Sequence, residues 1–224
     1  MTRLPVISVF VLLCGSIVNA DGQCKLSPCV TVDIYYESLC GSSMMFMRNE
    51  LIPSYPALKD YLNINFVPYG KASTKLSDAK KYSFTCQHGP TECQGNKAQA
   101  CGYNAILESG RSFEEKQSLA VSFIGCVMSS DNPATAVPQC AETAGLNEET
   151  RKTIDECGKS DAGDALLAAF GERTHDLKPK LAVVPTIVLD GVYTQENQDA
   201  AVSDFKKLIC SRISDEKKPA ICSK

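Results

Sequence analysis

The sequence predicts an α/β domain interrupted by a large cysteine-rich helical insertion. Runs of β-branched and aromatic residues stand near both ends of the chain, whereas helical periodicity and six cysteines fill the middle, over about residues 70–180. The 224 residues are 44% hydrophobic and 22% charged, the balance of an ordinary soluble globular protein with a sizeable core. This composition excludes a disordered tail or a fibre.

The first 20 residues have the features of a secretory signal peptide. Arg3 precedes an apolar run over residues 6–14, and small residues that suit a signal peptidase site end at Ala20. The run is far shorter than the roughly 20 apolar residues that span a bilayer. We therefore predict that residues 1–20 are removed, that residues 21–224 form the mature domain, and that no segment spans a membrane.

Net charge and cysteine content indicate which partners to expect and in which redox compartment the protein resides. Without Arg3 the mature chain has 22 basic and 26 acidic residues, a net charge of −4. It lacks the basic surplus that neutralises a phosphate backbone, so nucleic acid is not an expected partner. Loss of Cys14 from the 12 cysteines leaves 11, a number that indicates an oxidising compartment. Because 11 is odd, at least one thiol cannot pair within the monomer.

The first predicted elements are a strand and a helix joined at a cysteine. Residues 30–36 alternate as a strand does, with one face formed by Val30, Val32, Ile34 and Tyr36. A helix is expected to begin near Cys40 and to stop before Pro53, because Met44, Met47 and Leu51 recur at helical spacing. The Cys40 thiol would then lie at a helix N-terminus, where free amide groups and the helix dipole favour a thiolate.

Three further strands are predicted, one before the insertion and two after it. A second strand is predicted at residues 62–67, before Pro68, and a third at residues 183–189. Asp190 and Gly191 tolerate the positive φ of a type I′ turn, which predicts a hairpin with a further strand at residues 192–194. A final helix leads to Cys210, with one face formed by Val202, Phe205 and Ile209. This order of elements is typical of a thioredoxin-like fold.

The insertion contains a motif of eight residues at fixed spacing: Cys86, Gln87, His88, Gly89, Glu92, Cys93, Asn96 and Cys101. This motif resembles the signature of the gamma-interferon-inducible lysosomal thiol reductase (GILT) family. Residues 35–41 and 217–219 are similar to the segment entering the family's redox site and to its C-terminal end, so the resemblance covers nearly all of residues 30–222. It implies a thioredoxin-like fold, a secretory or endolysosomal route, and reduction of disulfides in protein substrates at acidic pH.

This chain departs from the family at the redox motif. The family has Cys-x-x-Cys, whereas here Cys40 is followed by Ser43. The resemblance makes Cys40 the candidate nucleophile, Ser43 the lost resolving position, and Pro185 the candidate cis-proline that faces the motif. A serine hydroxyl cannot resolve a mixed disulfide, so the fold should survive while net dithiol reduction should not. The family's tryptophan after this proline is also absent, which implies a changed substrate surface.

The odd cysteine is expected to be Cys40. The alternatives are a bridge from Cys40 to Cys24 or Cys29, or an intermolecular disulfide. We expect Cys210 to pair with Cys222, because these residues flank the C-terminal segment, and the other pairings stay open. The ten candidates for five bridges are Cys24, Cys29, Cys86, Cys93, Cys101, Cys126, Cys140, Cys157, Cys210 and Cys222.

A zinc site is a weaker interpretation of the signature. Cys86, His88, Cys93 and Cys101 offer metal-binding side chains, but spacings of seven and eight residues differ from the short pairs of structural zinc sites. Secreted cysteines also usually oxidise to disulfides. We therefore predict neither a metal nor a cofactor.

Three functions fit a lone thiol on this scaffold. Cys40 could exchange disulfides as a monothiol with an external small thiol, could hold partners as mixed disulfides, or could be vestigial in a protein that only binds. We predict a secreted protein with lost or severely reduced dithiol reductase activity that acts mainly by binding a protein partner or a disulfide-containing protein substrate. The chain has no Asn-x-Ser/Thr sequon for the glycan that lysosomal delivery requires, so secretion is expected instead.

Overall fold

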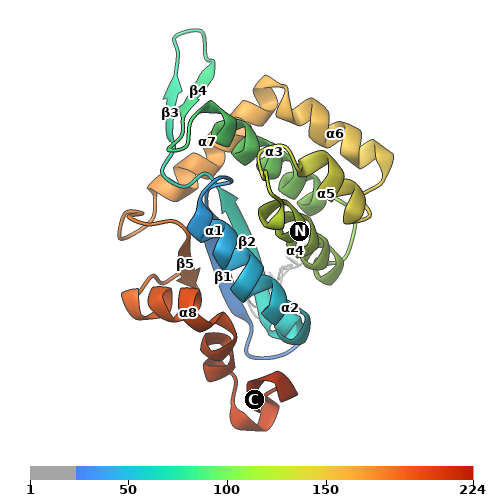
Figure 1. Cartoon of the computed structure of the whole chain (residues 1–224), viewed down its shortest axis with the longest axis vertical. Helices are drawn as coiled ribbons and strands as arrows, with labels where there is room; N and C mark the ends of the chain where they lie inside the picture. The colour runs from blue at the N-terminus through green and yellow to red at the C-terminus, as the bar shows by residue number, and fades with distance from the viewer. Residues whose placement is uncertain (1–23, 224) are drawn as a thin grey trace, which may run out of the picture.

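A mixed sheet forms the centre of the structure, a computed structural model that describes residues 24–223. Within these residues three strands pair in the order β2-β1-β5. They are β1 (Val30–Tyr36), β2 (Leu62–Pro68) and β5 (Thr186–Leu189). β1 runs parallel to β2 and antiparallel to β5. The predicted α/β architecture is confirmed (Figure 1), while the predicted signal peptide lies outside the described residues.

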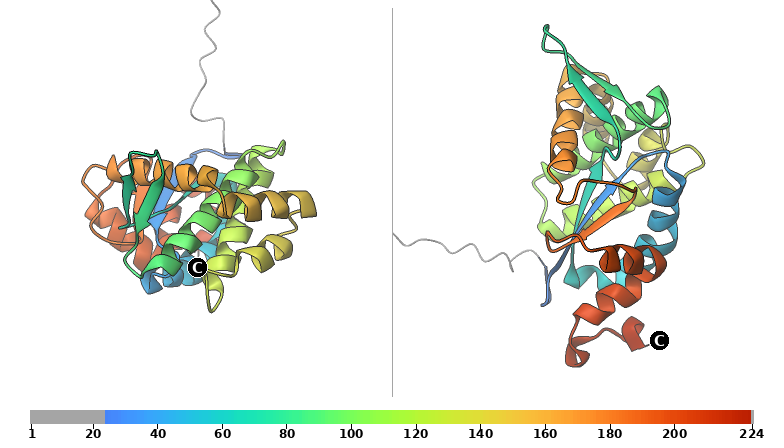
Figure 2. Two further views of the ribbon diagram at one scale, coloured as in Figure 1. Left: turned by 90° about the horizontal axis from the view of Figure 1, so that it is seen from above. Right: turned by 90° about the vertical axis from the view of Figure 1, so that its left-hand side faces the viewer.

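The central strand β1 is buried on both of its faces. Val32 and Ile34 on one face and Tyr35 on the other are all shielded from solvent. Helices provide this cover: in the right panel of Figure 2, the blue α1 (Gly41–Phe46) and the orange α7 (Asp161–His175) lie on opposite sides of the sheet. A strand enclosed in this way is typical of sheets with parallel pairs. The segment that follows β1 therefore emerges from the buried centre of the sheet.

The helix after β1 continues beyond the predicted stop at Pro53. It is formed by α1, a π-helical turn η2 (Met47–Leu51) and α2 (Ile52–Leu58), and the 3-10 turn η3 (Lys59–Tyr61) follows. The predicted stop before Pro53 is wrong because Pro53 lies in the first turn of α2. A proline lacks an N–H and crowds the preceding turn, and the wider π-helical turn accommodates both effects.

The segment between β2 and β5 begins with an unpredicted hairpin of β3 (Ser73–Leu76) and β4 (Tyr82–Thr85). Its strands are mostly exposed and only four residues long, and their apolar alternation is confined to Tyr82 and Phe84, so the sequence pattern does not reveal them. Figure 1 shows the hairpin projecting beside α7. The helices that follow are α3 (Pro90–Leu107), α4 (Phe113–Ser129), α5 (Val137–Thr143), α6 (Glu148–Gly158) and α7.

Disulfides hold these helices together. Among residues 24–223 the ten candidate cysteines form five bridges, and Cys40 is the one free cysteine. The expected bridge between Cys210 and Cys222 is confirmed. One bridge joins α3 to α6, and another joins α4 to α5. The five pairs are Cys24–Cys29, Cys86–Cys93, Cys101–Cys157, Cys126–Cys140 and Cys210–Cys222.

The turn after β5 forms as predicted, but the hairpin does not. Asp190 and Gly191 have φ values of 52° and 75°. Beyond them a single bridge between Leu189 and Val192 replaces the predicted strand at residues 192–194, so that prediction is wrong. The Asp190 carboxylate accepts a hydrogen bond from the Thr31 N–H at 2.8 Å, which ties the turn to β1 instead.

The last helix, α8 (Gln195–Arg212), is kinked at Asp204, where φ is −160° and ψ is 78°. Phe205 and Ile209 are buried, as predicted, but Val202 is 41% exposed. The kink interrupts the helical repeat, so Val202 does not share the buried face. The chain ends with the 3-10 turns η4 (Asp215–Lys217) and η5 (Ala220–Ser223). No helix within residues 24–223 has the length and apolar character needed to cross a membrane.

Close packing of α3 against α4 gives a test of this fold. A Cβ on Gly102 would lie 2.3 Å from the Phe123 ring, whereas a Cβ on Gly158, in α6, would meet no atom within 4 Å. We expect Gly102→Ala to lower the free energy of unfolding by about 1–3 kcal/mol through overpacking. Gly158→Ala should leave it unchanged or raise it by up to about 1 kcal/mol. Urea unfolding with the disulfides intact measures both, and equal effects would contradict the packing.

Candidate functional site

Cys40 occupies the turn between β1 and α1. It is the N-cap residue of α1, is 9% exposed and carries a free thiol. Its Sγ lies 3.6 Å from the carbonyl oxygen of Val184, to which the thiol donates, and the Val184–Pro185 peptide bond is cis. The structure thus brings together the candidate nucleophile and the candidate cis-proline.

Ser43 lies in the same first turn of α1 and is fully buried. Its Oγ has no hydrogen-bond partner among the described residues. A hydroxyl at this position is not appreciably ionised and forms no disulfide, so it cannot attack a sulfur bound to Cys40. Within the described structure, no second free thiol stands near Cys40 to perform that step.

The signature helix α3 fixes the loop that leads to Cys40. The Ser38 N–H donates to Asn96 Oδ1 at 2.8 Å, and the Ser38 hydroxyl donates to the carbonyl oxygen of Glu92 at 3.1 Å. Gly95 allows this approach, because a Cβ there would lie 2.6 Å from Ser38 Oγ. All four residues are buried. Two members of the predicted signature, Glu92 and Asn96, therefore support the thiol through the loop and not by contact with it.

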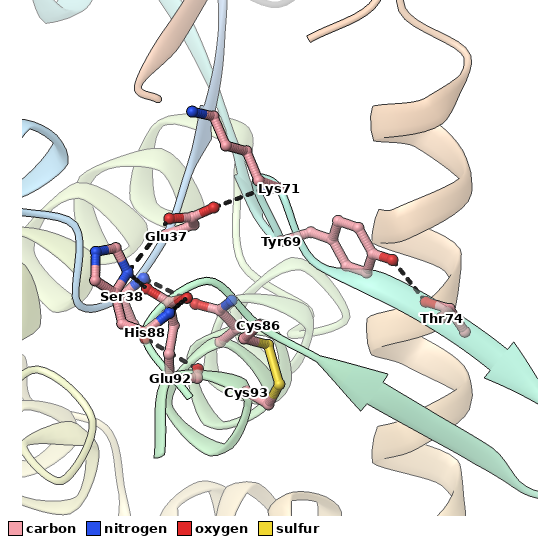
Figure 3. The surroundings of a disulfide bond; sticks show 10 residues. Glu37, Ser38, Tyr69, Lys71, Thr74, Cys86, His88, Glu92 and Cys93 are labelled. Carbon is pink, nitrogen blue, oxygen red and sulfur yellow. Dashed lines mark hydrogen bonds and ion pairs between the residues drawn. A yellow bond between two sulfur atoms is a disulfide. The ribbon is translucent and has the colours of Figure 1, made fainter. Parts of the chain in front are cut away.

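Another part of the signature forms a cluster of acidic groups around a histidine (Figure 3). His88 Nδ1 lies 2.5 Å from Glu92 Oε2 and 3.6 Å from Glu37 Oε2. Both carboxylates are fully buried, whereas the His88 side chain is 39% exposed. Burial raises the pKa of the Glu37 carboxyl, against the opposing effect of a hydrogen bond from the Lys71 backbone. We refer to these three residues as the Glu-His-Glu cluster.

The signature cysteines are all in disulfides. Cys86–Cys93 closes the loop before α3, and Cys101 pairs with Cys157 in α6. These pairings overturn the zinc interpretation built on Cys86, His88, Cys93 and Cys101, because disulfide sulfurs are not thiolate ligands. Within the closed loop, Gln87 is exposed. Gly89 has a φ of 88° as the N-cap of α3, a conformation that favours glycine.

The sequence pattern does not reveal the residues with which this helix forms hydrogen bonds. Ser38 and Glu37 carry no motif of their own, and Gln99 accepts a hydrogen bond from the Tyr36 hydroxyl at 2.8 Å. The available signal is the helical spacing of Glu92, Asn96 and Gln99, which places three polar side chains on one face of α3. A buried polar face needs hydrogen-bond partners, and the end of β1 and the loop after it donate to one oxygen of each of these residues.

An apolar surface adjoins the thiol. A cavity of about 410 Å³ lies between α1, α8 and the segment around the cis-proline, and Ser42, Val184 and Pro185 line it. Met45 is 59% exposed at this cavity, and Val183 and Val202 are also exposed there. Exposed apolar side chains beside a reactive group are typical of a surface that binds another molecule.

Removal of the Asn96 side chain tests the role of α3 in holding the thiol loop. We expect Asn96→Ala to lower the free energy of unfolding by about 1–3 kcal/mol, because the Ser38 N–H would stay buried without an acceptor. The loosened loop should also let Cys40 react faster with iodoacetamide. Asn104→Ala, farther along α3, is the matched control. Unchanged alkylation and stability in Asn96→Ala would contradict this role.

Comparison with known proteins places the chain in a family. Residues 31–144 match the model described as Gamma interferon inducible lysosomal thiol reductase (GILT). The chain is 34% identical over 193 residues to the Gamma-interferon-inducible lysosomal thiol reductase of Carassius auratus, covering 86% of this chain and 72% of that protein. GILT-like protein 1 of Drosophila melanogaster is 34% identical over 200 residues, with coverages of 87% and 78%. The Mus musculus reductase is 28% identical over 197 residues, with coverages of 88% and 73%. This chain belongs to the GILT family.

Proposed function

We propose that this protein is a secreted GILT-family member with a thioredoxin-like fold, in which dithiol disulfide reduction is lost or severely reduced. It acts mainly by binding a protein partner at the surface around Cys40. One observation carries the proposal: Cys40 is a free thiol at a helix N-terminus beside a cis-proline, while the residue three positions later is the buried hydroxyl Ser43.

The first half of thiol-disulfide exchange remains chemically available to Cys40. Its thiolate attacks one sulfur of a partner disulfide, the S–S bond of the partner breaks, and a new S–S bond joins Cys40 to that partner. The other partner sulfur leaves as a thiolate and takes up a proton. The start of the helix favours the attacking anion, and the apolar rim beside Pro185 offers contact area for the partner chain.

The second half of the exchange lacks its nucleophile. In a dithiol site a neighbouring cysteine attacks the mixed disulfide intramolecularly, releases the partner and becomes oxidised together with the first. Such attack benefits from an effective concentration far above that of a dissolved thiol. Ser43 offers only a hydroxyl, so the mixed disulfide is expected to persist. Binding is then the outcome that the site supports best.

A monothiol oxidoreductase or isomerase is the second candidate function. The free state of Cys40 favours this alternative, since its sulfur is not already held in a disulfide. One external thiol would displace the partner from Cys40, and a second would restore the Cys40 thiol and leave as a small disulfide. Reduction would then depend on the concentration of that thiol.

Export through the secretory pathway is consistent with the cysteine chemistry. Within residues 24–223 five disulfides form, and disulfides persist in oxidising compartments. Relatives in fish and mouse are named lysosomal thiol reductases. For this chain we propose secretion instead, because its sequence lacks an N-glycosylation sequon.

Restoring the second cysteine tests the loss of resolution. We expect Ser43→Cys to raise the rate of disulfide reduction by at least about 100-fold, because intramolecular groups reach effective concentrations of about 10⁵ M or more. The assay measures reduction of a fluorescent disulfide-linked peptide, at acidic and neutral pH, with reduced glutathione as the terminal reductant.

Two further variants control this assay. Cys40→Ser and the double variant Cys40→Ser/Ser43→Cys should both be inactive, since each lacks the thiol at position 40 that makes the first attack. A wild-type rate equal to that of Ser43→Cys would contradict the proposal. Wild-type activity that is proportional to glutathione and is lost in Cys40→Ser would instead support the monothiol alternative.

A further inference from the structure

The Glu-His-Glu cluster has a geometry that the thiol chemistry does not use. Glu37 Oε2, His88 Nδ1 and Glu92 Oε2 all lie within 4.8 Å of one another. These atoms come from the end of β1, the disulfide-closed loop and the first turn of α3 (Figure 3). We propose that the three side chains bind a divalent transition-metal ion of the zinc type.

Both carboxylates are oriented toward the same point by backbone hydrogen bonds. Glu37 Oε1 accepts from the Lys71 N–H at 2.6 Å, and Glu92 Oε1 accepts from the His88 N–H at 3.0 Å. These bonds leave the Oε2 atoms of both residues free to face the His88 ring. Outer hydrogen bonds of this kind orient the ligands of metal sites.

One candidate ligand atom accepts no hydrogen bond from the described residues. Glu37 Oε2 is buried and accepts no hydrogen bond from the described residues, although it points toward His88 Nδ1. A buried carboxylate oxygen without a partner is costly, and so are two buried carboxylates that share one histidine. A dication placed among the three atoms balances both negative charges and completes the coordination of Glu37.

The separations require only a small adjustment for a metal ion. With bonds of about 2.0–2.1 Å, the ligand atoms of a tetrahedral zinc ion lie about 3.3 Å apart. The distance from His88 Nδ1 to Glu37 Oε2 is already 3.6 Å, whereas the distance of 2.5 Å to Glu92 Oε2 must increase. His88 is partly exposed and not enclosed, so its ring can make this movement.

The donor types favour zinc over calcium or magnesium. An imidazole nitrogen suits zinc and other transition metals, while calcium and magnesium prefer oxygen ligands throughout. Three protein ligands and an exposed histidine edge leave a fourth position for water. The nearby Cys86 and Cys93 sulfurs form a disulfide and do not compete for the ion. The Cys40 N–H donates to the Glu37 carbonyl. An ion bound by the Glu37 side chain would therefore also stabilise the loop that holds the Cys40 thiol.

Calorimetric titration of the purified mature protein with zinc chloride at neutral pH tests the site. A Cys40→Ser background removes the one free thiol of the described chain, so the result is independent of the proposed thiol chemistry. We expect one zinc ion per chain. Glu37→Gln and His88→Gln should each weaken binding by at least about tenfold. His175→Gln, which changes the other histidine of the chain, should bind as the background does.

X-ray absorption of the zinc-loaded wild type gives a readout that needs no variant. The expected first shell contains only nitrogen and oxygen, with the multiple scattering of one imidazole. The proposal is overturned by the absence of stoichiometric binding, by sulfur in the first shell, or by equal affinity of the background, Glu37→Gln and His88→Gln proteins. Circular dichroism of each variant confirms that weakened binding does not reflect unfolding.

Discussion

Two hydrogen bonds from Ser38 to α3 position the thiol of this protein. They join the loop after β1 to Asn96 and to the backbone of Glu92, in a buried place where water cannot replace either partner. The helix that accepts them is itself fixed by a disulfide at its start and another that leads from its centre to α6. The cysteine-rich segment is therefore the frame that orients Cys40 and not a separate addition to the sheet.

The elements that position Cys40 are present, although a second thiol at position 43 is not. Cys40 stands at the start of its helix and faces the carbonyl before the cis-proline, as a site for sulfur chemistry requires, and an apolar cavity lies beside it. The residue that would end the reaction is absent, because Ser43 offers an oxygen where resolution needs sulfur. A thiol that is held in this position without a second cysteine can form a mixed disulfide with a partner more readily than it can release that partner. The proposed shift from reduction to binding follows from the oxygen of Ser43, which takes the place of a cysteine sulfur.

The sequence predicted the features that depend on local patterns. Strand β1 and the helix start at Cys40 followed from residue alternation and helical spacing. Cysteine parity predicted one unpaired thiol, and the resemblance to the GILT family identified it as Cys40. The continuation past Pro53 and the exposure of Val202 could not be predicted, because a π-helical turn and a kink change the repeat that periodicity assumes. The contacts of Ser38 were also hidden, since polar contacts between distant segments leave no repeat in either one.

The fate of the first adduct tests the central claim most directly. Wild-type protein with its disulfides intact, in excess, is mixed with two linear peptides that are joined by one disulfide, without external thiol. Released thiols and the mass of the protein are then followed over time. We predict one peptide thiol for each disulfide opened and a lasting covalent adduct at Cys40. Appearance of two peptide thiols together with a new disulfide within or between protein chains, or no reaction at Cys40 at all, would contradict the account.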